Sequence, residues 1–175
     1  PGTDTLTYNG TTVSGNVYVE DGRTYVPLRT TVQLLGGDAQ WDPYLDGAAV
    51  TTAEAEHDAV DLYWLSRIIY AESGNQPLDG KIAVGNVVLN RVASPRFPNS
   101  VYEVIFQRNQ FTPAANGSIN RTPSAESVVA AKLCLDGANT AGSALYFVNP
   151  TVAPGSWASR NRPYVATIGA HAFYG

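Results

Sequence analysis

The sequence predicts an α+β protein: a small β-rich unit at residues 1–53, a linker at 54–59 and a larger, mainly helical unit at 60–175. Two observations support this division. In the first part, short β-branched and aromatic segments alternate with Asn-Gly and Asp-Gly pairs, whereas in the second part apolar residues recur at helical spacing. The residues around the join are small and polar, which is typical of a linker.

In the first unit, two hairpins are predicted around Asn9-Gly10 and Asp21-Gly22. Asn-Gly and Asp-Gly favour the type I′ turn, because both of its central residues need positive φ. A short helix is expected from Pro27 to Leu35, followed by Gly36 and Gly37 as a stop. A last hairpin is expected further on, at residues 39–42 and 48–51.

Four helices are predicted in the second unit. The first is capped by Asp58, ends near Glu72 and is stopped by Gly74. The second, 77–92, is apolar nearly all round and should be the buried central helix. The other two are expected at 97–106, and at 123–136 with Thr122 as the N-cap. After Gly142 the sequence indicates loops and short extended pieces.

Composition and charge exclude several classes of function. Charged residues make up only 15 % of the chain, the net charge is −4 and the pI is near 5.0. Without a run of Lys or Arg, a nucleic-acid partner and a basic membrane attachment are both disfavoured. No apolar segment is long enough to cross a membrane, and no signal peptide is recognisable.

Cysteine and histidine are scarce, which limits the metal and redox chemistry that can be expected. The single Cys134 excludes an intrachain disulfide, and its apolar helical context predicts a buried structural thiol. With only His57 and His171 beside it, a zinc or copper site of the usual type cannot easily be assembled. No cofactor and no metal are therefore predicted.

Glu72 is the principal candidate for chemistry. Leu62, Leu65, Ile68 and Ile69 form one apolar stripe at helical spacing, and Glu72 continues it at the helix C-terminus. Burial and the negative end of the helix dipole both disfavour the charged carboxylate, so the pKa of Glu72 should be raised. Such a group suits general acid catalysis near neutral pH. The alternative is a Glu that turns outward at a frayed helix end.

The second unit resembles the SleB/CwlJ group of bacterial cell-wall hydrolases, the spore cortex-lytic type. Six segments match in order over the whole unit: LSRIIYAESG (65–74), GKIAVGNVVLNRV (80–92), FPNSV (97–101), QFTP (110–113), ALYFVNP (144–150) and IGAHAFY (168–174). One departure is Ala170, where the family leads us to expect Asn before the final His. The resemblance implies a lysozyme-like fold and an acid/base Glu at Glu72. It also implies peptidoglycan glycan strands as the substrate, cut between N-acetylmuramic acid and N-acetylglucosamine.

The first unit resembles the copper amine oxidase N-terminal-like domain. Residues 17–51 contain its hairpin ending in GRTYVPLR, a helix ending in Leu35-Gly36 and a Trp41-Asp42 strand. Copper binding is not carried over, because no His, Cys or Met lies between residues 1 and 56. The resemblance implies an accessory role, with possible contact to the wall or to a protein through residues 1–53.

The pair Glu72-Ser73 also looks like the catalytic pair of lysozyme-like lytic transglycosylases, which implies cleavage without water and an anhydromuramic product. An ordinary glycosidase needs a second carboxylate. Glu103 is the best candidate in this sequence, although a solvated helix residue is the more frequent case. Two alternatives remain: a hydrolytic muramidase that uses Glu72 and a water, and a non-catalytic wall-binding protein.

Other polar and aromatic residues are candidates for substrate binding, each with a structural alternative. They are Ser73, Gln110, Phe111, Tyr146, Asn149 and His171. Ser73 orients Glu72 or caps the helix. Gln110 and Phe111 are candidates to hold an acetamido group, with Phe111 as an anchor of the loop to the core as the alternative. Tyr146 and Asn149 line the groove, Tyr146 near Glu72, or belong to the core. Asn86 and Asn90 are expected to bond loops rather than sugar. The family resemblance implies an extracellular location, at the cell wall or the spore.

Overall fold

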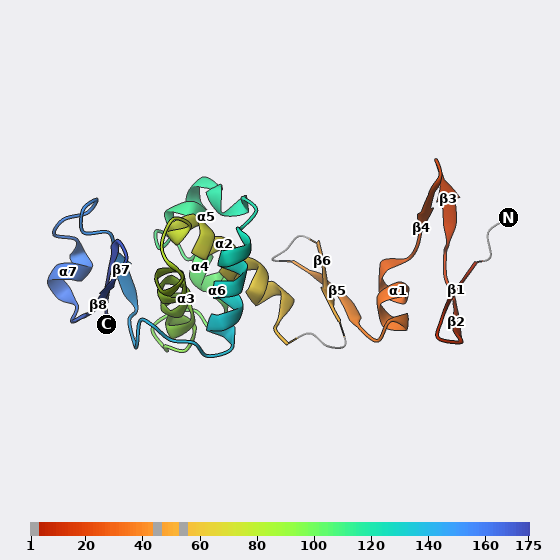
Figure 1. The fold of residues 1–175 in the computed structure, drawn as a ribbon, viewed down its shortest axis with the longest axis horizontal. Helices are drawn as coiled ribbons and strands as arrows, with labels where there is room; N and C mark the ends of the chain where they lie inside the picture. The colour runs from red at the N-terminus through yellow and green to blue at the C-terminus, as the bar shows by residue number, and fades with distance from the viewer. Residues whose placement is uncertain (1–3, 44–46, 53–55) are drawn as a thin grey trace. The chain divides into compact units, whose positions relative to one another are not determined.

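The computed structural model describes residues 4–43, 47–52 and 56–175, and the chain divides into two compact units, Pro1–Val60 and Asp61–Gly175 (Figure 1). Residues 53–55, where the predicted linker begins, lie outside the described residues. The α+β fold class is confirmed: β-hairpins and a short helix are found in the described part of the first unit, and helices dominate the second.

The described residues of the first unit form three separate antiparallel hairpins: β1 (Thr5–Tyr8) with β2 (Thr11–Ser14), β3 (Tyr18–Glu20) with β4 (Arg23–Tyr25), and β5 (Asp38–Asp42) with β6 (Gly47–Thr51). Both predicted two-residue turns are confirmed. Asn9 and Gly10 have φ of 47° and 81°, and Asp21 and Gly22 have 50° and 73°, as a type I′ turn requires. Helix α1 (Leu28–Leu34) lies between the second and third hairpins.

Seven further helical segments belong to the second part of the chain: α2 (Ala59–Ser73), α3 (Leu78–Val92), α4 (Val101–Phe106), α5 (Thr112–Asn116), the 3-10 turn η1 (Ser118–Asn120), α6 (Ala125–Leu135) and α7 (Trp157–Asn161). A three-stranded antiparallel sheet in the order β7-β9-β8 completes this unit, from β7 (Tyr146–Val148), β8 (Tyr164–Ile168) and β9 (His171–Tyr174). Among the described residues no helix is both long and apolar enough to cross a membrane.

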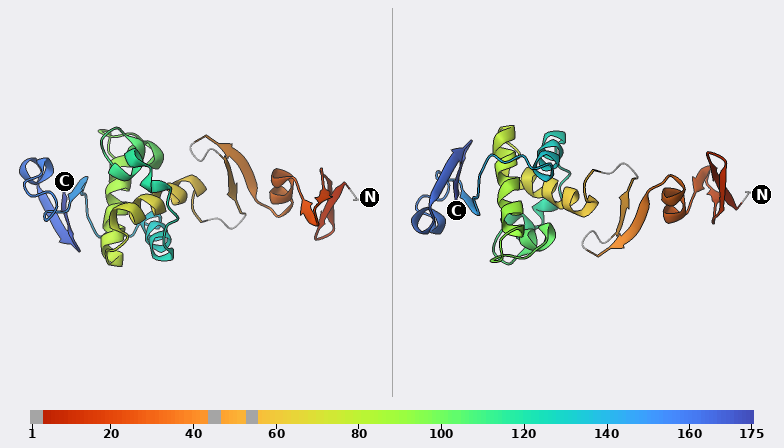
Figure 2. Two further views of the ribbon diagram at one scale, coloured as in Figure 1. Left: turned by 90° about the horizontal axis from the view of Figure 1, so that it is seen from above. Right: turned by 90° about the horizontal axis from the view of Figure 1, so that it is seen from below.

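Helix α3 is the buried centre of the helical unit, as predicted. Val84, Val87 and Val88 are inaccessible to solvent, and the helix packs against α4 and α6 (Figures 1 and 2). Gly85 lies directly against Ile69 of α2 and Cys134 of α6. The end of α2 that carries Glu72 is therefore held on a rigid helical core.

Two predicted helix starts were wrong, because a better N-cap lies closer to the helix. Helix α6 is capped by Ser124, whose Oγ accepts a hydrogen bond from the Ser127 N–H at 3.2 Å, and not by Thr122. Helix α4 begins only at Val101, because the Oγ of Ser100 accepts a hydrogen bond from the Glu103 N–H at 3.2 Å. In contrast, the predicted cap of α2 is confirmed: Asp58 accepts from the Val60 N–H at 2.9 Å.

Candidate active site

A pocket of about 400 Å³ opens at the C-terminal end of α2. One part of its lining is the last turn of α2 and the loop that follows, and the other part comes from η1 and its C-terminal neighbour. The lining residues are Tyr70, Ala71, Glu72, Gly74, Asn75, Ser118 and Arg121. The pocket thus brings Glu72 together with a segment that lies far from it in the sequence.

Glu72 is half-buried in this pocket, one residue before the end of α2. It follows Ile68 and Ile69, which are fully buried, so the predicted continuation of the apolar stripe is seen in the structure. Burial raises the pKa of the Glu72 carboxyl above its ordinary value of 4.5. Among the described residues, no hydrogen bond or ion pair engages this side chain. The carboxyl is therefore available to a ligand and inclined to keep its proton.

The residues that follow Glu72 have different roles. Ser73 is fully buried, and its hydroxyl donates a 2.7 Å hydrogen bond to the carbonyl of Ile69 within the same helix. It does not line the pocket. Gly74 ends the helix with a close backbone approach: a Cβ at this position would lie 2.6 Å from the carbonyl oxygen of Tyr70. Only glycine fits there without a shift of the chain that carries Glu72.

Arg121 and Ser118 form the other part of the pocket, and neither was singled out from the sequence. Gly117, at φ 77°, ends α5, and the side chain of Asn116 accepts a hydrogen bond from the Ser118 N–H at 2.9 Å. These turns direct the chain past the pocket. Arg121 is exposed and places a cation in the lining. The only sequence signal was an isolated Arg in a polar loop, which carries no spacing pattern.

Glu72 is the only carboxyl group among the described residues that line this pocket. Glu103 is exposed and lies in a capping arrangement, in which the Ser100 hydroxyl donates to its carboxylate at 2.9 Å. Glu126 is paired with Lys81 at 2.6 Å. Within the described part of the chain, no group of three His, Cys, Asp or Glu is arranged to hold a metal.

Two of the other predicted binding residues, Phe111 and Tyr146, lie around buried Arg91, and a third, His171, contacts Phe147, which in turn lies against Phe111. The Arg91 guanidinium lies 5.2 Å from the ring centre of Phe111 and 5.5 Å from that of Tyr146, and Phe147 lies 5.3 Å from His171. Arg91 also donates a 2.8 Å hydrogen bond to the carbonyl of Leu145. Burial lowers its pKa to about 10. The sequence did not reveal Arg91, because its partners Phe97, Phe111 and Leu145–Tyr146 come from three separate segments.

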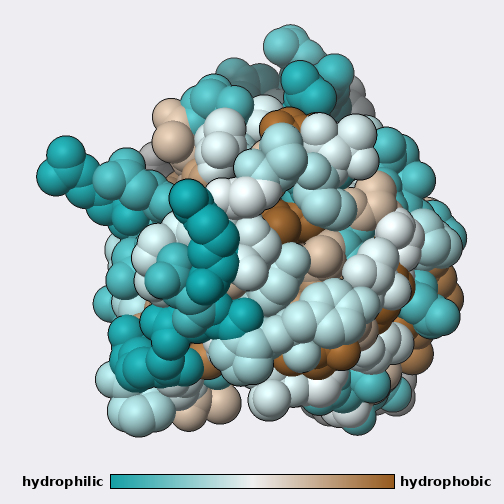
Figure 3. Space-filling model, turned by 90° about the vertical axis from the view of Figure 1, so that its left-hand side faces the viewer, coloured by the Kyte–Doolittle hydropathy of each residue, from teal (hydrophilic) through white to brown (hydrophobic). Residues whose placement is uncertain are grey.

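None of the predicted binding residues other than Glu72 lines the pocket. Phe111 is only 4 % exposed, and Tyr146 is half-buried with its hydroxyl 3.5 Å from Arg162. His171 is buried, which lowers its pKa and keeps the imidazole neutral near pH 7. Gln110 is exposed, and half-buried Asn149 accepts from the Thr151 N–H at 3.0 Å. Figure 3 shows one face of the molecule, on which hydrophobic areas are small and separated by hydrophilic ones.

The structural interpretations of Asn86, Asn90 and Cys134 are confirmed. Asn86 donates to the Ala138 carbonyl at 2.7 Å and accepts from the Thr140 N–H at 2.9 Å. Asn90 donates to two loop carbonyls at 2.9 Å each. Cys134 is buried, and burial raises the pKa of its thiol to about 12, which makes it inert.

Comparison with known families identifies the class of protein. Residues 75–174, more than half of the chain, match the Cell Wall Hydrolase family. The chain therefore belongs to the cell wall hydrolase family. Residues 7–88 match the copper amine oxidase N-terminal domain, so both resemblances predicted from the sequence are confirmed.

Within this family the chain is a homologue of spore cortex-lytic enzymes. It is 36 % identical over 140 residues to one from Bacillus cereus, with 79 % of this chain and 52 % of that protein covered. Over 113 residues it is 37 % identical to one from Bacillus subtilis, with 65 % and 37 % covered. The chain spans about half the length, or less, of these relatives.

Solved structures of two catalytic domains share the fold. The catalytic domain of the germination-specific lytic transglycosylase SleB from Bacillus anthracis superposes with a TM-score of 0.62 at 38 % identity. The alignment covers 66 % of this chain and 93 % of that domain. The catalytic domain of Bacillus cereus SleB gives 0.61 at 38 % identity, with 66 % and 89 % covered. The predicted SleB-like catalytic unit and the assignment as an enzyme are thus confirmed.

Proposed function

We propose that this chain cleaves peptidoglycan glycan strands between N-acetylmuramic acid and N-acetylglucosamine as a lytic transglycosylase, with Glu72 as its acid and base. The observation that carries the proposal is the half-buried Glu72 carboxyl, which is the only one in the described lining of the pocket and has a raised pKa. The similarity to a germination-specific lytic transglycosylase supports the same chemistry.

The reaction proceeds in two proton transfers on one carboxyl group. Protonated Glu72 donates its proton to the glycosidic oxygen as the bond from that oxygen to the muramic acid C1 breaks. The resulting Glu72 carboxylate then removes the proton from the C6 hydroxyl of the same sugar, whose oxygen bonds to C1. The products are a 1,6-anhydromuramic end and a free N-acetylglucosamine end. Glu72 is protonated again, and no water is consumed.

Hydrolysis by the same Glu72 is the alternative reaction. A water would then attack C1, and an ordinary glycosidase places a second carboxylate roughly 5–9.5 Å from the acid to assist that step. No second carboxylate is found in the described lining of the pocket. This observation favours the mechanism that needs one carboxyl group.

A binding protein without turnover is the alternative of a different class. A half-buried carboxyl without a bonded partner costs stability, and such a cost is maintained when the group has a chemical use. This argument favours catalysis over binding alone.

The other predicted residues are proposed to support binding from outside the pocket. Exposed Gln110 and half-buried Tyr146 and Asn149 extend the sugar-binding surface. Buried Ser73, Phe111 and His171 act through the packing of the residues around them.

The substrate and location follow from the relatives. We propose peptidoglycan at the cell wall or the spore, outside the cytoplasm, because the relatives are spore cortex-lytic enzymes. The first unit is proposed to contact the wall or a protein. Its exposed aromatic residues are suited to stacking on sugar rings: Tyr18 and Tyr25 stack at 4.9 Å, and Trp41 is 64 % exposed.

Substitution of Glu72 separates catalysis from binding. Glu72→Gln keeps the shape of the side chain but cannot donate and recover a proton, so muropeptide release should fall by roughly 10²- to 10⁴-fold. Glu103→Gln is the matched control, since this exposed carboxylate lies outside the pocket, and it should leave release unchanged. Equal release by Glu72→Gln and the wild type would rule out a catalytic role for Glu72.

A further inference from the structure

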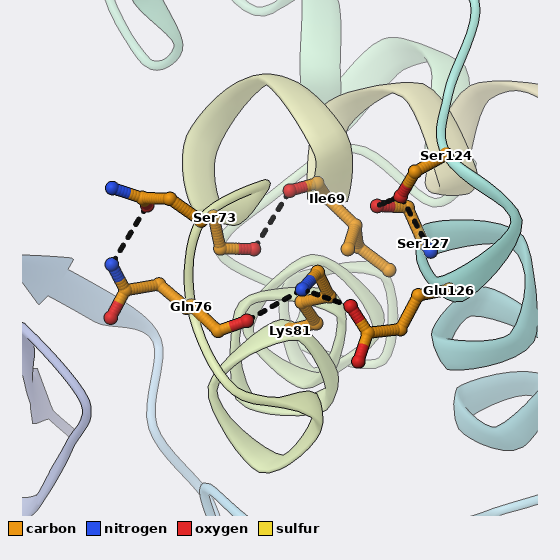
Figure 4. A network of polar contacts seen from close by, with 8 residues as sticks. Ile69, Ser73, Gln76, Lys81, Ser124, Glu126 and Ser127 are labelled. Carbon is orange, nitrogen blue, oxygen red and sulfur yellow. Dashed lines mark hydrogen bonds and ion pairs between the residues drawn. The ribbon is translucent and has the colours of Figure 1, made fainter.

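The loop at residues 74–77 joins α2 to α3 and continues the pocket wall that carries Glu72. Gly74 and Asn75 line the pocket, and Gln76 follows directly behind them. Gln76 is bonded on several sides, as Figure 4 shows in part: its N–H donates to the Ser73 carbonyl at 2.8 Å, and its own carbonyl accepts from the Lys81 ammonium at 2.5 Å. The position of this wall therefore depends on what holds Gln76.

Lys81 is the buried anchor of Gln76. Its side chain is only 2 % exposed, and its Nζ bonds both the Gln76 carbonyl at 2.5 Å and the Glu126 carboxylate at 2.6 Å (Figure 4). A buried ammonium is costly unless it is paired and hydrogen-bonded, so both contacts are needed to keep it there. Glu126 itself is 56 % exposed, in the first turn of α6.

The turn between β8 and β9 holds Gln76 from another side. The Ala170 N–H donates to Oε1 of Gln76 at 2.8 Å. Gly169 has φ 58°, and a Cβ on it would lie 2.4 Å from the same oxygen, so the turn closes directly on Gln76. The contact uses the main chain of residue 170, and the alanine found there in place of the expected Asn is compatible with it.

The ion pair also connects the two parts of the pocket lining. Glu126 lies in the first turn of α6, which follows Arg121 after a short segment, while Lys81 reaches the loop after Glu72. The Lys81–Glu126 contact is therefore a direct link between the segment that carries Glu72 and the segment that carries Arg121.

We propose that Lys81 is a positioning residue for the cleavage reaction. By binding both the Gln76 carbonyl and the Glu126 carboxylate, it fixes the position of the pocket wall that carries Glu72 relative to the segment that carries Arg121. The inference rests on the proposed function of Glu72. Displacement of a catalytic group by about 1 Å can cost roughly 100-fold in rate. Because Lys81 holds Gln76, the residue next to pocket-lining Asn75, it is well placed to control turnover.

The test compares Lys81→Met with Lys132→Met in the full chain. Methionine fills a similar volume and removes the charge, and Lys132 is an exposed lysine on α6 that serves as the matched control. We measure kcat and KM on solubilised glycan strands, thermal unfolding, and amide hydrogen exchange at Gln76 and Ala170. We expect Lys81→Met to lower kcat roughly 10- to 100-fold with a smaller change in KM, to stay folded at the assay temperature, and to exchange both amides faster. Lys132→Met should match the wild type.

The inference is overturned if Lys81→Met keeps the wild-type kcat, or if its activity falls only as far as its folded fraction while both amides stay protected. Should Lys81→Met fail to fold, Glu126→Ala removes the exposed partner of the same anchor. It should also lower kcat and speed exchange at Gln76, and unchanged values would overturn the inference.

The proposed function is tested separately. The identity of the wild-type product decides whether cleavage is transglycosylation, whereas amide exchange and the ratio of variant to wild-type turnover decide the role of Lys81. Hydrated wild-type products with a slow Lys81→Met variant would reject transglycosylation and keep the positioning role.

Discussion

Glu72 and Arg121 line the same pocket, although they come from the end of α2 and from the segment after η1. The first is a half-buried acid with a raised pKa, and the second is an exposed cation. The pocket therefore brings together a carboxyl group that is inclined to keep its proton and a positive charge.

The pKa of Glu72 sets the pH dependence of activity. The reaction starts from the protonated carboxyl, so the rate should fall as pH rises through the raised pKa of Glu72, above its ordinary value of 4.5. A pH profile of kcat/KM measures this directly. A fall of kcat/KM with rising pH that is centred at or below pH 4.5 would contradict a Glu72 pKa raised by burial.

The same pKa makes a prediction for stability. Folding raises the pKa of Glu72, so the folded state binds this proton more tightly than the unfolded state, and the contribution to stability is full below pH 4.5 and lost as pH rises through the folded pKa. Glu72→Gln has no such loss. The Tm of Glu72→Gln relative to wild type should thus increase between pH 4 and pH 8, and a constant difference would count against the raised pKa.

Arg121 should contribute to binding of the glycan strand. Peptide stems on muramic acid carry carboxylates, and an exposed guanidinium in the lining is suited to one of them. We expect Arg121→Ala to raise KM for stem-bearing strands by up to about tenfold, with little change in Tm. Arg108→Ala, another exposed arginine, is the control. Equal KM values for both variants would remove Arg121 from the binding surface.

Gly74 should tolerate no side chain. A Cβ there would lie 2.6 Å from the Tyr70 carbonyl, so the end of α2 must shift in Gly74→Ala. We expect a loss of about 1–3 kcal/mol in the free energy of unfolding, together with reduced turnover, because Glu72 lies two residues earlier. Chemical denaturation measures the first and muropeptide release the second. A fully stable, fully active variant would show that this backbone approach is not required.

The long helices and the hairpins could be predicted because their signals are local. In the stripe from Leu62 to Ile69 and in the apolar run of α3, the spacing of apolar residues predicts the helix and its buried face. The pair Asn9-Gly10 predicts its turn from its own two residues. Helices of a single turn, such as α5 and α7, are too short to show a period. Thr122 and Ser124 are both acceptable cap residues by type, and only the backbone decides that Ser124 is the cap.

The candidate site was predictable only where its chemistry is local to one helix. Glu72 could be chosen from its place on the apolar face of α2. The direction of Ser73 depends on its bond to Ile69, and the place of Arg121 in the lining depends on how the loop after α5 packs. Lys81 and Glu126 pair across 45 positions, and no spacing rule connects them.

The most direct test of the central claim is the mass of the muropeptides that the wild-type chain releases from purified peptidoglycan, with Glu72→Gln as the blank. The one-carboxyl mechanism predicts anhydromuramic ends, each lighter by one water than the hydrolytic product, and none from Glu72→Gln. Release of only hydrated, reducing ends would contradict transglycosylation through Glu72.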